Sequence, residues 1–526
     1  MSFDYVIVGA GPAGLALAQC LSKNKSSILI IERESTIGGC HRVRRVKDSK
    51  TNQSLFTEHG PRVYSETYNV FKELLKEMNV DFYKLFKKYK FNILEIGGET
   101  IFSVLNFSEF TSLTVSFLNL LINDSYGQTI NLYDYLKQHH FSEKSLHMID
   151  KICKLTDGGG HQKFTLNEFL ELFNQQFIYS LYQPTLPNDI GLFNIWYDFL
   201  KSRNVQFLFH STITDIHIDK KNNNIESVSI SKIGIQDEYI HITTKNLILA
   251  IPPKNIYNML LSCGISDAFG LTDNEFYNFS KQTAYLDYLS VTYHWDTNLF
   301  SSTSQNSRPL KKVYGFPKSI WGVAFIVLTD YMTFTESVSK TVISASIVEL
   351  NIKSPRLNKT ANECTEKELL SEILYQFKSI FEENGYVIPE PTVSLISSGI
   401  YYNKSTKTWE CLDTAFISSN KFTPLPFKSP IITNLYNLGT HNGKSLYKFT
   451  SLESAVSNAV ILAKELQQEN HFIIPKHVKA YSLTDVLKII FYVIIILFIY
   501  FKYFKTSSNG TTTNIKFNPT RIKYYQ

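Results

Sequence analysis

The sequence predicts an α/β protein in which an N-terminal β-α-β unit begins a parallel sheet, an α+β region is inserted, and an apolar helix lies near the C-terminus. Three observations support this prediction. Two short apolar strands, over residues 4–8 and 28–31, flank a glycine turn and a helical stretch. Aromatic and β-branched runs recur in the middle of the chain, as a mixed sheet requires. An uncharged apolar run covers residues 489–501.

The composition indicates an ordinary globular protein. The chain of 526 residues is 44% hydrophobic and 19% charged, and it is long enough for two domains. Its net charge of +6 is small for this length, and no long basic run with interleaved aromatic residues occurs, so we expect no nucleic-acid partner. The six cysteines form no CxxC pair and no Cys/His ligand spacing. We therefore expect a reducing compartment and no bound metal.

The glycine turn after the first strand has the spacing of a dinucleotide-binding fingerprint. Gly9 allows the tight turn, Gly11 lets a pyrophosphate approach the backbone, and Gly14 lets the helix pack close to the sheet. The phosphates would lie at the helix N-terminus, where free N–H groups favour anions. The cofactor-binding residues predicted in this segment are Gly9, Gly11, Pro12, Ala13 and Gly14.

The second strand ends on an acid, Glu32. A carboxylate at this position can accept hydrogen bonds from both hydroxyls of an adenosine ribose. It also disfavours a 2′-phosphate, so we do not expect NADP as the ligand.

The residues after Glu32 carry a resemblance to a known family. Arg33, followed by Gly38 and Gly39, resembles the extended fingerprint of the flavin amine oxidase and phytoene desaturase superfamily. The resemblance implies a Rossmann-like FAD-binding domain, an inserted α+β substrate domain and non-covalent FAD. Members commonly have Arg after the two glycines, whereas this chain has Cys40. Either Arg42 replaces that phosphate contact or the contact is absent.

The next matching segment contains Gly60, Pro61 and Arg62. In the resembled family a segment here runs along the flavin, and its glycine lets the ring approach the backbone. The same three residues resemble UDP-galactopyranose mutase, a flavoenzyme of related fold. A solvated turn residue is the alternative interpretation of Arg62.

The middle of the chain contributes two further family features. Ile213 matches the aliphatic residue whose backbone contacts the adenine in the flavin amine oxidases, although an ordinary buried strand residue would look the same. The run Ala250–Pro253 resembles the segment that returns the chain to the FAD domain. The glycine run at 157–161 lacks the strand and the Lys-Ser/Thr of a P-loop, so we interpret it as a loop.

A further segment resembles the closing FAD motif of the family: it contains Gly439, Thr440 and the helix start at Leu452. The resemblance implies that this helix points its N-terminus at the flavin. Thr440 stands where members have an acid, and Ser454 stands where they have a glycine. Many amine oxidases place a lysine against flavin N5, but neither Lys312 nor Lys318 can be aligned with it, so no catalytic residue is assigned.

The apolar run near the C-terminus predicts a transmembrane helix over residues 486–504, followed by a polar tail over 505–526. Lysines at both ends and tyrosines near them suit a membrane interface. A buried core helix is the alternative. We expect a single C-terminal membrane anchor with the body in the cytosol.

The predicted organisation divides the chain into alternating parts of two domains. The FAD domain takes 1–90, 201–283 and the closing motif 431–470, and the substrate domain takes the helical part 91–200 and the sheet and helix 284–430. The reaction implied by the resemblance is hydride transfer from an amine or a lipophilic, isoprenoid-like substrate to flavin N5. A mutase-like flavoenzyme is the runner-up, and a flavin-binding relic that acts as a membrane scaffold is the third hypothesis.

Overall fold

A computed structural model of the chain describes residues 1–48, 52–60, 62–89, 101–123, 125–157, 159–172, 180–234, 239–282, 289–299, 313–315, 319–383, 387–397, 399–411, 425–445, 450–467 and 483–504. The chain forms two units, Met1–Val478, here called the body, and Lys479–Gln526. Pro61, Lys312, Lys318 and the predicted polar tail lie outside the described residues.

The body is built on a sheet whose described strands follow the order β8-β2-β1-β11-β10-β9, with β19 paired to β11. The pairs that involve β1, β2, β8, β19 and the end of β11 are parallel, whereas β10 pairs antiparallel with both β9 and β11. The strands are β1 (Ser2–Val8), β2 (Ile28–Ile31), β8 (Gln206–Leu208), β9 (Ser211–Asp219), β10 (Asn224–Lys232), β11 (Tyr239–Leu249) and β19 (Leu435–Asn437). The predicted Rossmann-like α/β fold is confirmed.

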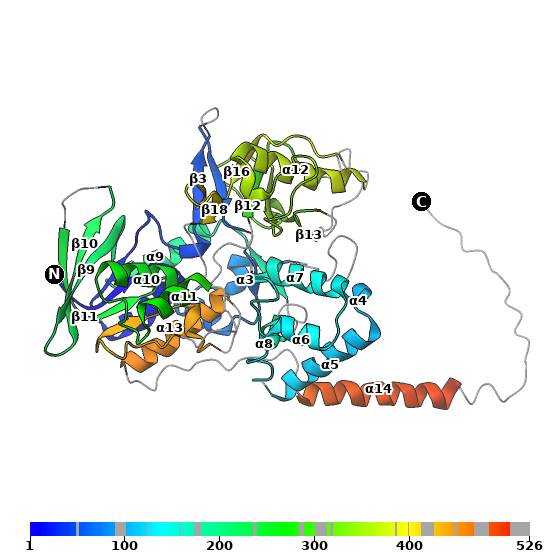
Figure 1. The fold of residues 1–526 in the computed structure, drawn as a ribbon, viewed down its shortest axis with the longest axis horizontal. Coiled ribbons are helices and arrows are strands. Elements are labelled where there is room, and N and C mark those ends of the chain that lie inside the picture. Colours follow the sequence, from blue (N-terminus) through cyan, green and yellow to red (C-terminus); the bar gives the residue numbers. More distant parts are fainter. Residues whose placement is uncertain are drawn as a thin grey trace, which may run out of the picture. The chain divides into compact units, whose positions relative to one another are not determined.

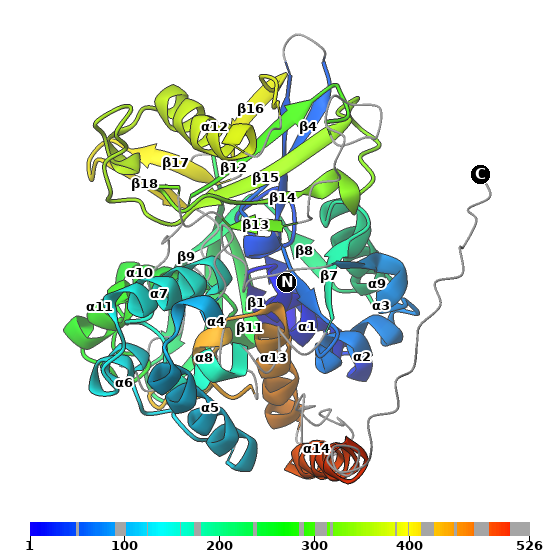
Figure 2. The ribbon, with the colours of Figure 1, turned by 90° about the vertical axis from the view of Figure 1, so that its right-hand side faces the viewer.

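Two helices cover the parallel part of this sheet. Every residue of α1 (Pro12–Leu21) is buried, because its small apolar side chains let it pack against the sheet and against α13 (Leu452–Gln467). Figure 2 shows α1 and α13 beside β1 and β11. Apolar residues at helical spacing within residues 66–90 form α2 (Asn69–Glu77), which buries its apolar face against α13. On the β9–β11 side lie α10 (Pro253–Ser262) and α11 (Asp273–Gln282).

A second, antiparallel sheet has the described order β13-β14-β15-β12-β16. Its strands are β12 (Leu289–Trp295), β13 (Val313–Gly315), β14 (Ala324–Val327), β15 (Thr341–Ile347) and β16 (Val393–Ile396). One face is covered by α12 (Glu366–Glu383), whose Leu369, Ile373 and Phe377 are buried in the same core as the sheet. Figure 1 shows α12 beside β12 and β16. The hairpin of β17 (Ile400–Asn403) and β18 (Thr408–Cys411) follows.

Smaller elements connect the two sheets. The ribbon of β3 (Val43–Lys47) and β4 (Ser54–Glu58) is antiparallel, and a small sheet has the order β5-β7-β6. Helices α5 to α8 form a separate helical group in Figures 1 and 2. The remaining elements are β5 (Tyr64–Ser65), β6 (Phe86–Tyr89), β7 (Leu181–Pro184), α3 (Phe82–Leu85), α4 (Ile101–Val104), α5 (Phe107–Ile122), α6 (Leu132–Gln138), α7 (Glu143–Asp157), α8 (Leu166–Leu172) and α9 (Asn194–Ser202).

The second unit contains α14 (Leu483–Phe504), which confirms that the apolar C-terminal run is helical. Within the ranges given above, no helix is both long and apolar enough to cross a membrane. The predicted transmembrane span over 486–504 is therefore corrected: the structure supports a helix there but not a span.

Candidate cofactor site

The predicted cofactor residues gather at one edge of the main sheet. Gly9 follows the end of β1, Glu32 follows β2, Ala250 follows β11, and Gly439 comes shortly after β19. These strands run parallel, so their carboxyl ends meet at the same edge, which is where open α/β sheets bind ligands. Backbone hydrogen bonds tie the ends together, from Gly9 N to Ile31 O at 2.8 Å and from Ala250 N to Val8 O at 2.8 Å.

The three glycines of the fingerprint are required at their positions for different physical reasons. At Gly9, where φ is +105°, a Cβ would lie 2.5 Å from Ala250 O, and at Gly14 it would lie 2.1 Å from Gly9 O. The packing of the chain alone therefore requires a glycine at both positions. At Gly11 a Cβ would meet only Gly39 Cα, at an ordinary 3.7 Å. The described protein leaves space beside Gly11, and this space fits the pyrophosphate approach predicted there.

Glu32 is buried and has several partners. Its carboxylate accepts hydrogen bonds from Ala10 N at 2.8 Å, Glu34 N at 3.0 Å and the Arg42 guanidinium at 3.1 Å. A carboxylate has about four acceptor positions, so one remains for a ribose hydroxyl. Arg42 is also buried, and its second hydrogen bond goes to Thr36 O. The structure thus places Arg42 as the counter-charge of Glu32, while the phosphate contact of Arg42 stays a prediction. The side chain of Arg33 is partly exposed to solvent and forms an ion pair with Glu34 at 3.2 Å.

The second glycine turn packs directly on the first. Gly38 N donates to Ala10 O at 2.8 Å, and a Cβ on Gly39 would lie 3.0 Å from Gly11 Cα. Arg62 donates to Cys40 O, which joins the Gly60 segment to this turn. Gly60 has a φ of +74°, a conformation that favours glycine. The structure therefore brings Gly38, Gly39, Gly60 and Arg62 together, although Pro61 between them is not described.

Ile213 and the segment with Gly439, Thr440 and Leu452 lie near the same edge of the main sheet. Ile213 is buried on β9, whose first residue, Ser211, donates its N–H to Glu32 O at 3.0 Å. Gly439 and Thr440 form a short helical turn, and Asn458 on α13 donates to Gly439 O at 2.7 Å. Leu452 is the first residue of α13. The contacts of Ile213 with adenine and of Gly439, Thr440 and Leu452 with the flavin stay predictions.

A buried polar cluster behind Gly60 was missed by the sequence interpretation. Tyr64 donates to Asn188 Oδ1 at 3.1 Å and lies 3.5 Å from His41 Nδ1, and His59 Nδ1 lies 3.6 Å from Cys411 Sγ. Burial lowers the pKa of His59 to about 3, so this imidazole is neutral at physiological pH.

Glu58 belongs to the same cluster. Its side chain is fully buried, and burial raises the pKa of its carboxyl to about 7. The signal in the sequence was the strand alternation of β4, which places this acid on the same face as Phe56.

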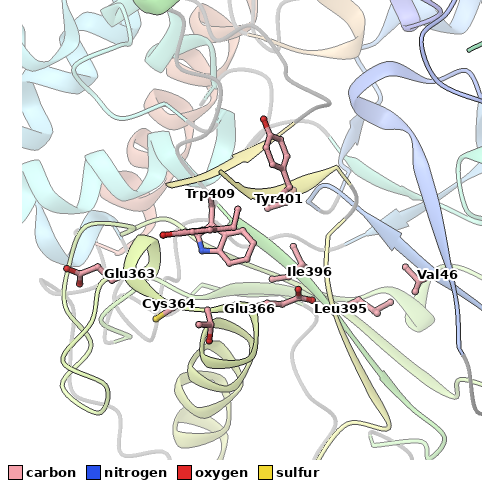
Figure 3. A pocket seen from close by; sticks show the side chains of 11 residues that line it. Val46, Glu363, Cys364, Glu366, Leu395, Ile396, Tyr401 and Trp409 are labelled. Atoms are coloured by element: carbon pink, nitrogen blue, oxygen red, sulfur yellow. The ribbon is translucent and has the colours of Figure 1, made fainter. Parts of the chain in front are cut away.

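A separate groove of about 620 Å³ lies outside this edge. Figure 3 shows Tyr401 and Trp409 of the β17–β18 hairpin on one side and Cys364 and Glu366 at the start of α12 on the other. None of the predicted cofactor residues lines it.

The N-terminal segment is similar to a known family of nucleotide-binding domains. Residues 7–78 match the family described as NAD(P)-binding Rossmann-like domain. The UDP-galactopyranose mutase of Mycoplasma genitalium is 30% identical over 167 residues, which cover 28% of this chain and 40% of that protein. The mutase of Mycoplasma pneumoniae is 32% identical over 63 residues, which cover 12% of this chain and 15% of that protein. The chain thus matches less than half the length of these curated relatives.

Solved structures share the fold over most of the chain. An oxidoreductase from Methanosarcina mazei has a TM-score of 0.58 at 14% identity, covering 88% of this chain and 100% of that one. Putrescine oxidase with bound putrescine has a TM-score of 0.57 at 12% identity, covering 89% and 100%. Residues 7–78 are therefore similar to a Rossmann-type dinucleotide-binding domain. The chain as a whole shares its fold with the Methanosarcina mazei oxidoreductase and with putrescine oxidase.

Proposed function

We propose that the body is an FAD-dependent oxidoreductase that removes hydride from an amine or a lipophilic, isoprenoid-like substrate. The observation that carries the proposal is the space beside Gly11, at the sheet edge where Glu32 and Gly439 also lie. Packing explains Gly9 and Gly14 without any ligand. A Cβ on Gly11 would meet only Gly39 Cα, at 3.7 Å, so a ligand that approaches the backbone there accounts for the glycine at this position. FAD, when bound, supplies the flavin N5 that accepts the hydride.

The residues of the chain bind and orient the reactants. The free N–H groups at the start of α1 favour the pyrophosphate, and Glu32 has an acceptor position left for a ribose hydroxyl. Ser451 and Ser454 cap α13 reciprocally, each hydroxyl accepting the other's backbone N–H at 3.0 Å. The positive end of this 16-residue helix favours negative charge, which is the role expected of the Leu452 turn.

The absorbance spectrum of the purified chain, before and after heat denaturation, tests this proposal. Yellow protein that releases free FAD is expected, because the contacts above are non-covalent. Anaerobic bleaching of the flavin would then be screened with amines and polyenes. Folded protein that stays colourless after incubation with FAD would refute the proposal and favour the scaffold hypothesis.

A mutase-like flavoenzyme is the second candidate, favoured by one specific observation. The curated relatives named above are UDP-galactopyranose mutases, and the Gly60–Arg62 segment carries the same resemblance. Isomerisation of UDP-galactopyranose without net oxidation would support this candidate. Bleaching of the flavin by an amine or polyene, with no isomerised sugar product, would exclude it.

We also propose that α14 attaches the protein to a membrane surface. Large apolar side chains are exposed along the described part of this helix, among them Ile490, Phe491 and Ile494. Such a surface favours the boundary between lipid headgroups and acyl chains. Flotation with lipid vesicles is expected for the full chain and should be lost in the Ile490→Lys/Ile494→Lys variant. Equal flotation of the two proteins would contradict the proposal.

A further inference from the structure

The second sheet has an open edge at β16. This strand pairs with β12 on one side, and no described strand pairs with its other side. All four of its residues are partly exposed. An open edge directs backbone N–H and C=O groups outward, and proteins commonly protect such an edge with lysine or proline. The sequence of β16, Val-Ser-Leu-Ile, contains neither, so the strand itself does not block pairing with another chain.

The groove of about 620 Å³ described above reaches this open edge. Leu395 and Ile396, two successive residues of β16, both line it. Successive side chains of a strand point to opposite faces of the sheet, so this groove passes around the open side of the strand rather than lying on one face. Figure 3 shows these two residues with Val46 on one side and Trp409 on the other. The groove therefore gives a ligand access to the backbone of β16.

The walls of the groove are apolar and aromatic. The β17–β18 hairpin and the β3–β4 ribbon supply Ile400, Tyr401, Tyr402, Trp409 and Val46. The rings of Tyr402 and Trp409 pack edge to face, with their centroids 5.3 Å apart. Val46, Tyr401 and Tyr402 are 41%, 39% and 37% exposed. These walls offer contact area to large apolar side chains of an extended segment.

The start of α12 adds two acids to the groove. Glu363 and Glu366 line it, and none of the other described lining residues is charged. Glu363 accepts the backbone N–H of Thr360 at 2.8 Å, which fixes its position. A second copy of this chain, paired edge to edge, would bring the same acids close together and would be repelled. The charge of the groove therefore favours a different partner, one that carries basic side chains.

We propose that the open edge of β16 binds an extended segment of a partner protein, which adds a strand to the second sheet. Apolar side chains of this segment lie against the Tyr402–Trp409 wall, and a lysine or arginine faces Glu363 and Glu366. Backbone hydrogen bonds supply the affinity and the side-chain contacts supply the specificity. The inference goes beyond the proposed function, because none of the predicted cofactor residues lines the groove.

The test uses the full-length chain and the synthetic peptide acetyl-Thr-Val-Lys-Val-Lys-Val-Thr-amide. One control peptide has glutamate in place of both lysines. A second control has N-methyl groups on both lysines and on the central valine, which removes backbone donors towards both of its edges. Binding is measured by calorimetry, and hydrogen exchange of the backbone amides of β16 is measured with and without peptide.

The lysine peptide should bind and should slow hydrogen exchange in β16. The N-methylated peptide should bind about tenfold more weakly or worse, because it loses backbone hydrogen bonds. The glutamate peptide should also bind more weakly, because it is repelled by the acids of the groove.

A matched pair of variants tests the role of the acids. Glu366→Gln should weaken binding of the lysine peptide about two- to fivefold, as expected for an exposed ion pair. Glu382→Gln removes an exposed acid near the other end of α12 and should leave binding unchanged. Both residues are exposed, so both variants are expected to fold, and thermal unfolding checks this.

Several results would overturn the inference. These are no binding of the lysine peptide, equal binding of the N-methylated peptide, unchanged exchange in β16 on binding, or equal effects of Glu366→Gln and Glu382→Gln. Dimers of the chain that dissociate when the lysine peptide is added would assign the edge to a second copy instead, and would also overturn it.

Discussion

Two fully buried acids in this chain differ in what surrounds them. Glu453, in the first turn of α13, accepts from the backbone N–H groups of Val70 and Phe71 at 2.8 and 3.0 Å, at the start of α2. Glu58 has no such partners among the described residues. Burial raises the pKa of both carboxyls to about 7, and the two backbone bonds act in the opposite direction only at Glu453.

The same contrast separates two glycines. Gly14 is explained by the chain itself, because Gly9 O occupies the place of its Cβ, whereas a Cβ on Gly11 would make only an ordinary 3.7 Å contact with Gly39 Cα. The difference teaches that burial alone does not identify a functional residue. A buried group whose capacity is used inside the chain serves the fold, and one whose capacity is unused points to a ligand.

The largest effect is expected from alanine at the two glycines. Gly14→Ala puts a Cβ 2.1 Å from backbone and should cost about 5 kcal/mol or more in the free energy of unfolding, so that little soluble protein forms. Gly11→Ala meets only an ordinary contact and should fold with less than about 1 kcal/mol of change, but lose FAD. Urea unfolding and flavin content measure both. Equal stability losses in the two variants would break the distinction.

A somewhat smaller effect is expected at Arg42. Arg42→Met leaves the buried Glu32 carboxylate without its counter-charge and should cost about 3–5 kcal/mol. Thermal unfolding of the variant measures the loss, and Arg33→Met, at an exposed pair, is the matched control with less than about 1 kcal/mol. Similar losses in the two variants would show that the buried pair does not stabilise the fold.

Replacing Glu453 tests the satisfied acid. Glu453→Leu leaves two buried N–H groups of α2 without acceptors and should cost about 2–6 kcal/mol, since each is worth about 1–3 kcal/mol. Calorimetry at pH 5 is the suitable measurement. A loss below about 1 kcal/mol would mean that these backbone bonds contribute little.

The smallest effect, and the one of opposite sign, is expected at Glu58. Below about pH 4.5 its carboxyl is protonated in both the folded and the unfolded chain; as pH rises towards 7 the unfolded chain ionises first, so stability falls. Glu58→Gln removes this dependence and should raise the stability at pH 8 by up to roughly 3 kcal/mol. Melting temperatures of both proteins between pH 4.5 and 8 measure it. Parallel pH curves would contradict the unsatisfied state of Glu58.

The cofactor edge was largely predictable because its signals are local. Gly9, Gly11, Gly14 and Glu32 lie within one β-α-β unit, where spacing alone fixes which strand ends carry them. The partners of Arg42 were not predictable, because its counter-charge is chosen by how two loops pack. The transmembrane span was predicted from apolar length, and the structure supports only a helix there.

The sequence by itself determined the Rossmann-type unit, the acid after the second strand and the amphipathic pattern of α2, because glycine spacing and hydrophobic periodicity act over a few residues. Only the tertiary structure decided which buried polar groups are satisfied. Glu453 meets α2 across 383 residues of chain, while the residues around Glu58 come from the β3–β4 ribbon, β7 and the second sheet. Whether a buried acid has partners depends on segments far apart in sequence, and no local pattern encodes where they meet.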